Sequence, residues 1–269
     1  MSKDSLDISF GRAAFGDDPA AYHAARPAYP EALWDRLGER CGLGPGTAVF
    51  EVGPGAGAAT ERLLTAGADL VLAIEPDRRM AAFLEQRLGS PALDVLIAPF
   101  ESAVLPKAFD LGVSATAFHW VEQRSGLAKA ARGLKSGAWW AMWWTNFGDE
   151  DAPDPFHLAT RHLFAETPRT PAHGAKGGRS FATDRAARLS DLASAGFVAG
   201  EVDFWPWNQA LETAHLIALY ATFSPIIAMA APARARLLDG LAEIAERDFG
   251  GVVERPFSTI LYTARRPQA

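Results

Sequence analysis

Short apolar runs and amphipathic stretches alternate along the first half of this 269-residue chain. The apolar runs end in glycine, acidic or small residues, which is typical of strands buried on both faces of a parallel sheet. Between them lie stretches with apolar residues at helical spacing, such as Met80, Phe83, Leu84 and Leu88. The predicted strands are 47–53, 69–75, 93–100, 109–118 and 137–144, and the predicted helices begin near Pro30 and cover 57–68, 76–89 and 121–134. This alternation predicts βαβ units and an α/β sheet with helices on both faces.

The regular alternation of predicted strands and helices ends after residue 144. Residues 145–180 are rich in Pro, Gly and charge, which indicates an insertion or lid rather than core. Order then resumes with a predicted helix over 184–197, a strand over 199–207, helices near 210–222 and 232–247, and a closing strand over 256–266. No internal repeat or low-complexity tract is visible, so the chain is expected to form one domain with added segments.

Composition narrows the class of protein. Hydrophobic residues make up 49% and charged residues 22%, as in ordinary soluble globular proteins. The net charge of −6 argues against a nucleic-acid partner, because neutralising phosphates needs clustered Lys and Arg. The single cysteine, Cys41, excludes internal disulfides and cysteine-based zinc sites. Because there is no signal-peptide pattern and no run near ~18 apolar residues, we expect a cytoplasmic protein without a membrane span.

The stretch VFEVGPGAG, residues 49–57, joins a predicted strand to a predicted helix through three glycines. Glycine lets the backbone turn tightly and approach a ligand closely, and the helix that follows offers free N–H groups. A Walker-type phosphate loop is excluded, since no Gly-Lys-Ser/Thr follows. The spacing Gly53-x-Gly55-x-x-Ala58 fits the looser dinucleotide fingerprint, so a nicotinamide cofactor and a methyl donor both stay open at this point.

Two acidic residues bear on the choice between a nicotinamide cofactor and a methyl donor. Glu51 stands two residues before Gly53, where dinucleotide folds usually carry an apolar residue; its carboxylate is suited to a ligand ammonium or to orienting the loop. Glu75 ends the second strand and suits a ribose, because a carboxylate accepts hydrogen bonds from both hydroxyls. Since both cofactor classes contain a ribose, Glu75 alone does not separate them.

Several motifs in the same order resemble class I S-adenosylmethionine-dependent methyltransferases, in the small-molecule group that includes trans-aconitate methyltransferases. EVGPGAG resembles the first family motif, IEPD the second, APFES the adenine-contacting turn and FDLGVSATAFHWV the fourth-strand motif. RPAYP near the start and FSTILYTARR at the end are also similar to this group. The resemblance covers residues 15–148 closely and 183–266 in layout.

The resemblance implies a cofactor, S-adenosylmethionine, and the residues that hold it. Gly53, Pro54, Gly55 and Gly57 would line its methionine part, with the backbone of Ala115 and Thr116 nearby. Glu75 would hold the ribose, Pro76 and Met80 would lie against the adenine, and Phe100 and Glu101 would close the adenine pocket. Glu51 is expected to reach the cofactor region, and Tyr22 and Arg26 to cap the cofactor from the N-terminal helix.

The resemblance also implies a fold. We expect a Rossmann-like seven-stranded sheet whose last strand is antiparallel, within a single domain over residues 1–269. The core would cover about 42–148 and 183–266. A helical cap would be built from about 15–41, 146–181 and 210–247, and would exclude water once both ligands bind.

The chemistry requires an acceptor aligned with the donor's methyl and sulfur, without a covalent intermediate or a metal. His119 is the candidate general base, because it follows the fourth strand at the sheet edge where ligands bind and titrates in the useful range. The alternative is that His119 and Trp120 form a packing pair that shapes the pocket. Trp120 and Trp144 are candidate contacts of a flat or apolar acceptor, and Arg169, Lys176 and Arg179 are candidate partners of an acceptor carboxylate.

The expected function is methyl transfer to a small-molecule acceptor by in-line displacement, at oxygen, nitrogen or carbon. One alternative is an NAD(P)-dependent oxidoreductase, against which Glu51 and the fourth-strand motif speak. A second is a non-methylating member that binds S-adenosylmethionine for regulation or another reaction. The sequence leaves the acceptor and the oligomeric state open.

Overall fold

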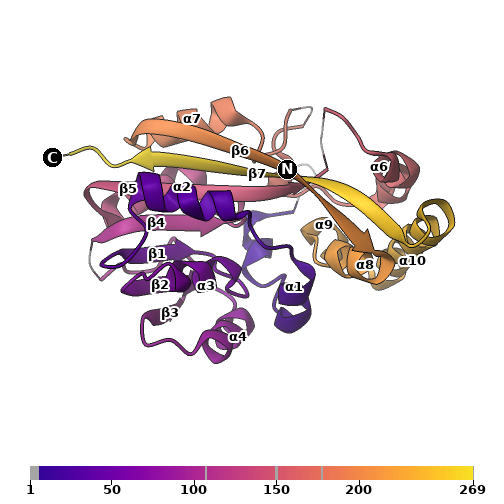
Figure 1. Cartoon of the computed structure of the whole chain (residues 1–269), viewed down its shortest axis with the longest axis horizontal. Helices are drawn as coiled ribbons and strands as arrows, with labels where there is room; N and C mark the ends of the chain where they lie inside the picture. The colour runs from indigo at the N-terminus through magenta and orange to yellow at the C-terminus, as the bar shows by residue number, and fades with distance from the viewer. Residues whose placement is uncertain (1–5, 107, 149–150, 177, 269) are drawn as a thin grey trace.

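The computed structural model describes residues 6–106, 108–148, 151–176 and 178–268. Within these residues, seven strands form one sheet with the order β3-β2-β1-β4-β5-β7-β6 (Figure 1). The strands are β1 (Ala48–Val52), β2 (Leu70–Glu75), β3 (Leu93–Ile97), β4 (Phe109–Ala115), β5 (Leu134–Phe147), β6 (Val198–Glu212) and β7 (Val252–Arg265). Strands β1 to β5 are parallel, and β7 runs antiparallel to both β5 and β6. The prediction of a Rossmann-like sheet with an antiparallel last strand is confirmed.

Helices pack against both faces of the sheet. The core helices are α2 (Glu31–Cys41), α3 (Ala58–Thr65), α4 (Arg78–Leu88), α5 (Gln123–Gly133) and α7 (Arg185–Ser194). Helices α2 and α3 share one apolar cluster with the sheet, and α5 and α7 share a second cluster on its other face. The local sequence sets where helices begin and end. Asp77 caps α4 by accepting a hydrogen bond from the backbone N–H of Arg79 at 2.9 Å, and Gly42 ends α2 at φ 72°.

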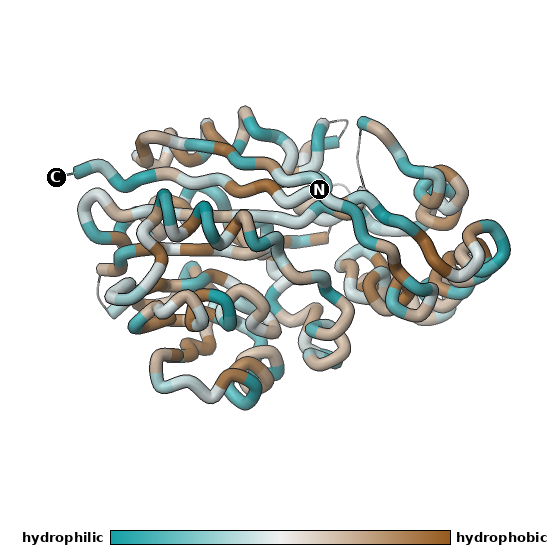
Figure 2. Tube along the Cα trace, viewed as in Figure 1, coloured by the Kyte–Doolittle hydropathy of each residue, from teal (hydrophilic) through white to brown (hydrophobic). Residues whose placement is uncertain are grey.

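The tryptophans of β5 divide between the two faces, as the period of a strand requires. Trp140 and Trp144 belong to the cluster under α5 and α7, whereas Trp143 belongs to the cluster under α2 and α3. Figure 2 shows hydrophobic stretches along the central strands and more hydrophilic ones on the outer helices and turns. A strand with two buried faces carries almost no polar residue, which explains the run AWWAMWW.

A group of smaller elements lies at one end of the sheet, and we call it the cap. It consists of η1 (Ile8–Arg12), α1 (Pro19–Ala25), α6 (Pro155–Thr160), η3 (Arg161–Glu166), η4 (Pro171–His173), α8 (Thr213–Ala221), α9 (Ser224–Ile227) and α10 (Ala231–Phe249). Strands β6 and β7 extend past the other strands and reach α8 and α10 (Figure 1). A third apolar cluster, which includes Phe156, Leu216 and Leu241, joins these strand ends to α6, α8 and α10.

One expectation about elements needs correction: residues 210–212 continue β6, so the helix expected near 210–222 begins at Thr213. The segment interpreted as an insertion or lid carries α6, η3 and η4 among its described residues; residues 149, 150 and 177 lie outside them. No helix in the described part of the chain is long and apolar enough to span a membrane.

Candidate active site

The glycine turn after β1 is built from left-handed backbone. Gly53, Gly55 and Gly57 have φ values of 68°, 56° and 85°, a region that side chains rarely adopt. A Cβ at Gly53 would lie 2.6 Å from the Cβ of Ala117, so the turn approaches the end of β4 closely. The turn leads directly into α3, whose N-terminal N–H groups point back toward it. Only glycine fits this path.

Glu75 links the turn to the start of α4. Its Oε2 accepts from the backbone N–H of Gly55 at 2.9 Å, and its Oε1 accepts from the backbone N–H of Asp77 at 2.9 Å. The side chain is buried, and that burial raises its pKa to about 7. A carboxylate has about four lone-pair sites, so its two backbone bonds orient it and leave capacity for two ligand hydroxyls.

A cavity of about 630 Å³ opens between this edge of the sheet and the cap. The predicted site residues that line it are Tyr22, Arg26, Gly53, Pro54, Gly55, Glu75, Pro76, Met80, Phe100, Glu101, Ala115, Thr116, His119, Trp120 and Trp144. The structure therefore brings together residues from the ends of β1, β2, β4 and β5, the turn after β3, and the segment around α1. Strand ends of a parallel sheet meet at one edge, which explains this convergence.

Two of the residues predicted to hold the cofactor lie outside the cavity lining, Glu51 and Gly57. Glu51 is fully buried behind the turn, where its Oε2 accepts from the Thr60 hydroxyl at 2.7 Å. Its Oε1 has no partner among the described residues, and burial raises its pKa to about 7. Gly57 begins α3, and a Cβ there would lie 2.3 Å from the Leu84 side chain. Both residues thus support the turn from behind.

Thr116 has a φ of 53°, which is unusual for a β-branched residue. It stands just after β4, and its hydroxyl lies 3.2 Å from the Tyr29 hydroxyl. Burial raises the pKa of Tyr29 to about 12, so the phenol stays protonated. Strained backbone of this kind gathers at functional sites, and both residues line the cavity.

His119 lies in η2 (Phe118–Trp120), directly after β4, and its ring is buried. The indole Nε1 of Trp144 donates to His119 Nδ1 at 3.0 Å. Burial and the nearby Arg26 and His173 lower the pKa of His119 to about 3. The ring is therefore neutral throughout the physiological pH range.

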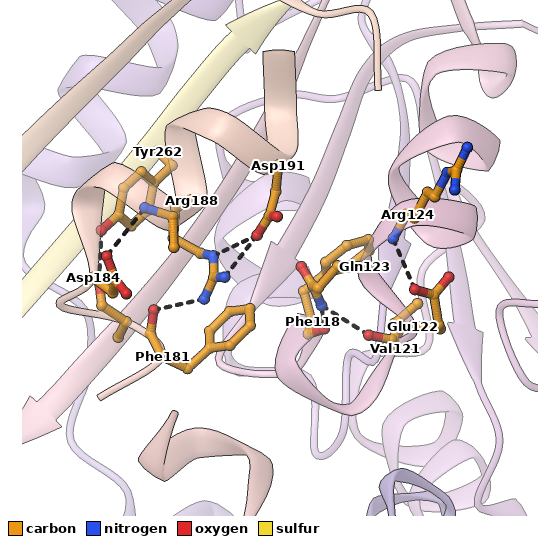
Figure 3. A network of polar contacts seen from close by, with 12 residues as sticks. Phe118, Val121, Glu122, Gln123, Arg124, Phe181, Asp184, Arg188, Asp191 and Tyr262 are labelled. Carbon is orange, nitrogen blue, oxygen red and sulfur yellow. Dashed lines mark hydrogen bonds and ion pairs between the residues drawn. The ribbon is translucent and has the colours of Figure 1, made fainter. Parts of the chain in front are cut away.

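Polar side chains fix two segments that lie next to His119. Gln123 Nε2 donates to the carbonyls of Phe118 and Val121, each at 2.8 Å, which fixes the turn that carries His119 (Figure 3). Arg188 Nη1 donates to the carbonyl of Phe181 at 3.0 Å, and its guanidinium lies 3.5 Å from the centre of that ring (Figure 3). The Phe181 ring lies 6.1 Å from the His119 ring, so both segments are held by polar contacts from the α5 and α7 side.

Arg26 brings a cation into the cavity from the end of α1. Its guanidinium lies 5.0 to 5.3 Å from the ring centres of Tyr22, Phe147 and Phe223. One of its terminal nitrogens donates to the carbonyl of Thr222 at 3.0 Å, and its buried Nε has no partner among the described residues. An unpartnered buried donor in a cavity is suited to an anionic group of a ligand.

The end of β5, the cap and the segments that connect them contribute lining residues that the sequence did not single out. These include Phe15, Tyr29, Asn146, Phe147, His157, Thr170, His173, Phe181 and Phe223. Arg169, predicted for an acceptor carboxylate, also lines the cavity, where it donates to the carbonyls of His173 and Gly174. Lys176 and Arg179 do not line it, and Arg179 pairs with Asp151 at 3.0 Å. Residue types alone offered no signal for these positions beyond the expected cap ranges.

The sheet edge and its glycine turn have a counterpart among known families. Residues 50–142 match the family model described as a methyltransferase domain. Over these residues the chain is similar to class I S-adenosylmethionine-dependent methyltransferases. The resemblance to that class, stated from the motifs, is thereby confirmed, and S-adenosylmethionine is the cofactor of this domain. The narrower resemblance to trans-aconitate methyltransferases is not shown.

Individual relatives of this methyltransferase domain match over limited lengths. An uncharacterized methyltransferase of Mycobacterium bovis, Mb3374, is 32% identical over 152 residues, which are 55% of this chain and 56% of the relative. Ribosomal RNA small subunit methyltransferase A of Synechococcus sp. (strain WH7803) is 45% identical over 75 residues, which are 26% of this chain and 27% of the relative. The chain thus spans about a quarter to just over half the length of these curated relatives.

A solved structure shows how far the fold extends beyond the matched segment. Phosphoethanolamine N-methyltransferase 2 of Haemonchus contortus was solved with phosphomonomethylethanolamine and S-adenosylhomocysteine. It superposes with a TM-score of 0.57 at 12% identity, over 97% of this chain and 59% of that one. The methyltransferase fold therefore includes the cap segments as well as the sheet.

Proposed function

We propose that this protein transfers a methyl group from S-adenosylmethionine to a small-molecule acceptor. The observation that carries the proposal is the single cavity in which the glycine turn, Glu75 and the end of β4 face aromatic and cationic residues of the cap. One end has the groups that a nucleoside and an amino acid require, and the other end provides a separate, largely apolar surface. Both ligands of a methyl transfer then share one enclosed space.

The residues at the sheet edge fit the donor. We assign Glu75 to the ribose hydroxyls, since its backbone bonds leave lone pairs free. Pro76, Met80, Phe100 and Glu101 would enclose the adenine.

Gly53 and Gly55, with Pro54 between them, bring backbone close to the methionine part, and Ala115 and Thr116 border it. Tyr22 and Arg26 would close over this end, with the Arg26 guanidinium toward the methionine carboxylate. The bound donor supplies an electrophilic methyl group on a sulfonium, and the protein binds, orients and keeps water out.

The cap end fits a small acceptor. Trp120, Trp144, Phe147, Phe181 and Phe223 offer flat apolar surfaces, and Arg169 adds a second cation. A cavity of about 630 Å³ lies in the range of small-molecule sites. The net charge of −6 also argues against an RNA acceptor, and the ribosomal RNA relative aligns over only 26% of this chain.

The layout of the chain is part of the proposal. We infer one methyltransferase domain over residues 1–269, with its core at about 42–148 and 183–266 and cap elements at about 15–41, 146–181 and 210–247, except that α2 within the first of these cap ranges packs on the sheet with the core. The motifs RPAYP and FSTILYTARR support a small-molecule enzyme that resembles trans-aconitate methyltransferases. A cytoplasmic location is consistent with such substrates.

The first test measures donor binding. Calorimetric titration and thermal unfolding are each carried out with S-adenosylmethionine, S-adenosylhomocysteine and NADH. Saturation with the sulfur ligands at ~100 times their dissociation constants adds about 2.7 kcal/mol to the free energy of unfolding. In Glu75→Gln, the charged partner of two hydroxyls is lost, so the affinity should fall about 10- to 100-fold. Glu85→Gln, which neutralises an exposed acid of α4, is the matched control and should bind as the wild type does.

The outcomes separate the alternatives. Stabilisation by NADH but not by the sulfur ligands would replace the proposal with an oxidoreductase. A broad set of small acceptors is then tested, and S-adenosylhomocysteine is detected by mass spectrometry. If the chain binds S-adenosylmethionine but releases no S-adenosylhomocysteine with any of them, the non-methylating alternative is favoured. Release of S-adenosylhomocysteine together with a product that is heavier than the acceptor by the mass of one CH₂ group supports methyl transfer.

A further inference from the structure

The hydrogen bond between Trp144 and His119 determines which ring nitrogen of His119 carries the proton. An indole N–H donates and cannot accept, so His119 Nδ1 must be the acceptor of the 3.0 Å bond. A neutral imidazole carries one proton, which must then reside on Nε2. The Nδ1 edge of the ring is occupied by Trp144, so the opposite edge, with Nε2–H, is the one available to a ligand in the cavity that His119 lines.

The surroundings keep this ring neutral. His119 is 7% exposed, and the rings of Trp120, Trp144 and Phe181 lie 5.1, 6.5 and 6.1 Å from its own. The charged or titratable groups that act on it are Arg26, from the end of α1, and His173, from η4, and both disfavour a second proton. Burial acts in the same direction, and no carboxylate among the described residues acts to favour the imidazolium.

We propose that Trp144 fixes His119 as a neutral Nε2–H donor, so that His119 positions a lone pair of the acceptor and does not take a proton from it. Trp144 is then a positioning residue that acts through His119. The inference rests on the proposed function for its acceptor and on the hydrogen bond from Trp144 to His119 Nδ1 for its tautomer. It replaces the general-base role expected for His119 from its place after the fourth strand.

The inference narrows the class of acceptor. The acceptor presents a hydrogen-bond-accepting atom to His119, and the atom that attacks the methyl group must be nucleophilic as it binds, with no proton that has to be removed first. A carboxylate, an acidic phenol as its phenolate or a neutral amine meets this requirement, whereas an unactivated alcohol does not. Arg169, the cation at the acceptor end of the cavity, favours the anionic members of this class.

The test is a long-range ¹H–¹⁵N NMR spectrum of the full chain labelled with ¹⁵N-histidine, without ligand, between pH 5 and 8. This spectrum distinguishes the two neutral tautomers and the imidazolium for each of the six histidines. His119 is assigned by the signal missing from His119→Gln. If that variant does not fold, single substitutions of His23, His157, His162, His173 and His215 assign His119 by elimination.

We expect His119 in the Nε2–H tautomer with no titration over this range. In Trp144→Phe, the signal should change to a mixture of tautomers, because the donor to Nδ1 is gone. Trp140→Phe is the matched control: it lies on the same strand and face, and its indole Nε1 has no partner among the described residues. Its His119 signal should equal that of the wild type.

Three results would overturn the inference: an Nδ1–H tautomer in the wild type, titration of His119 between pH 5 and 8, or an unchanged His119 signal in Trp144→Phe. Because the spectrum is recorded on the free chain, its outcome does not depend on donor binding. Failure of the chain to bind S-adenosylmethionine would remove the proposed function and its acceptor, while leaving the tautomer result in place.

Discussion

Glu51 offers the sharpest test of the energetics behind the glycine turn. Its carboxyl group is fully buried, accepts one hydrogen bond from Thr60, and has a second oxygen without a partner among the described residues. Ionising it in that position is costly, and burial raises its pKa from 4.5 to about 7. Glu51→Gln keeps the shape and the bond to Thr60 but removes the ionisation.

The sign and size of the effect follow from proton linkage. Between pH 4.5 and about 7, folded Glu51 holds a proton that the unfolded chain has released, so the free energy of unfolding falls as the pH rises. At about 1.4 kcal/mol per pH unit, the loss reaches about 3 kcal/mol and is complete above pH 7. We therefore expect Glu51→Gln to match the wild type near pH 4.5 and to be more stable by up to about 3 kcal/mol at pH 8.

The assay is thermal or urea unfolding of both proteins, without ligand, at pH 4.5, 6 and 8. A gain of 3 kcal/mol corresponds to about 6 to 12 °C for a chain of this size. Titrations of groups that do not interact with Glu51 cancel in the difference between variant and wild type, whereas the nearby Glu75 carboxylate acts in the same direction on Glu51 as burial does. Glu85→Gln, on the exposed face of α4, should stay within about 0.5 kcal/mol throughout. A Glu51→Gln protein less stable than the wild type at pH 8 would refute the reasoning, because it would mean that the ionised carboxylate is stabilised in the fold.

Two further predictions concern the turn and the cap. Gly53→Ala should lower the affinity for S-adenosylhomocysteine and cost roughly 2 kcal/mol or more of stability, because the new Cβ meets Ala117 at 2.6 Å and φ is 68°. Gly46→Ala, at φ 86° with nothing within 4 Å, should show the backbone strain alone in the same unfolding and titration measurements; equal effects of both variants would contradict the close approach. Arg255→Ala leaves the buried Asp154 carboxylate without its ion-pair partner and should cost about 3 to 5 kcal/mol in urea unfolding. Arg247→Ala, which breaks an exposed pair, should cost under about 1 kcal/mol, and a similarly small cost at Arg255 would show that Asp154 is satisfied in another way.

The donor end of the site could be predicted from the sequence because each of its parts is local. A strand buried on both faces produces an apolar run, and the residues just after it reach the ligand edge whatever the helices do. Gly53, Gly55, Glu75 and Phe100 each follow such a run, and all line the cavity. Glu51 was misplaced because a strand alternates its faces: with Phe50 and Val52 in one apolar cluster, position 51 points to the other side, toward Thr60.

The sequence by itself therefore determined the class of fold, the cofactor and the residues at the sheet edge of the cavity. Only the tertiary structure decided the cap side of the cavity, because its residues come from segments far apart in the chain. The rings of Phe147 and Phe223 lie 4.7 Å apart, and no local pattern encodes that contact. The protonation of His119 was decided in the same way. From the sequence, a histidine at the ligand edge of a sheet is interpreted as a general base. The structure shows that Trp144, 25 residues away, donates to its Nδ1.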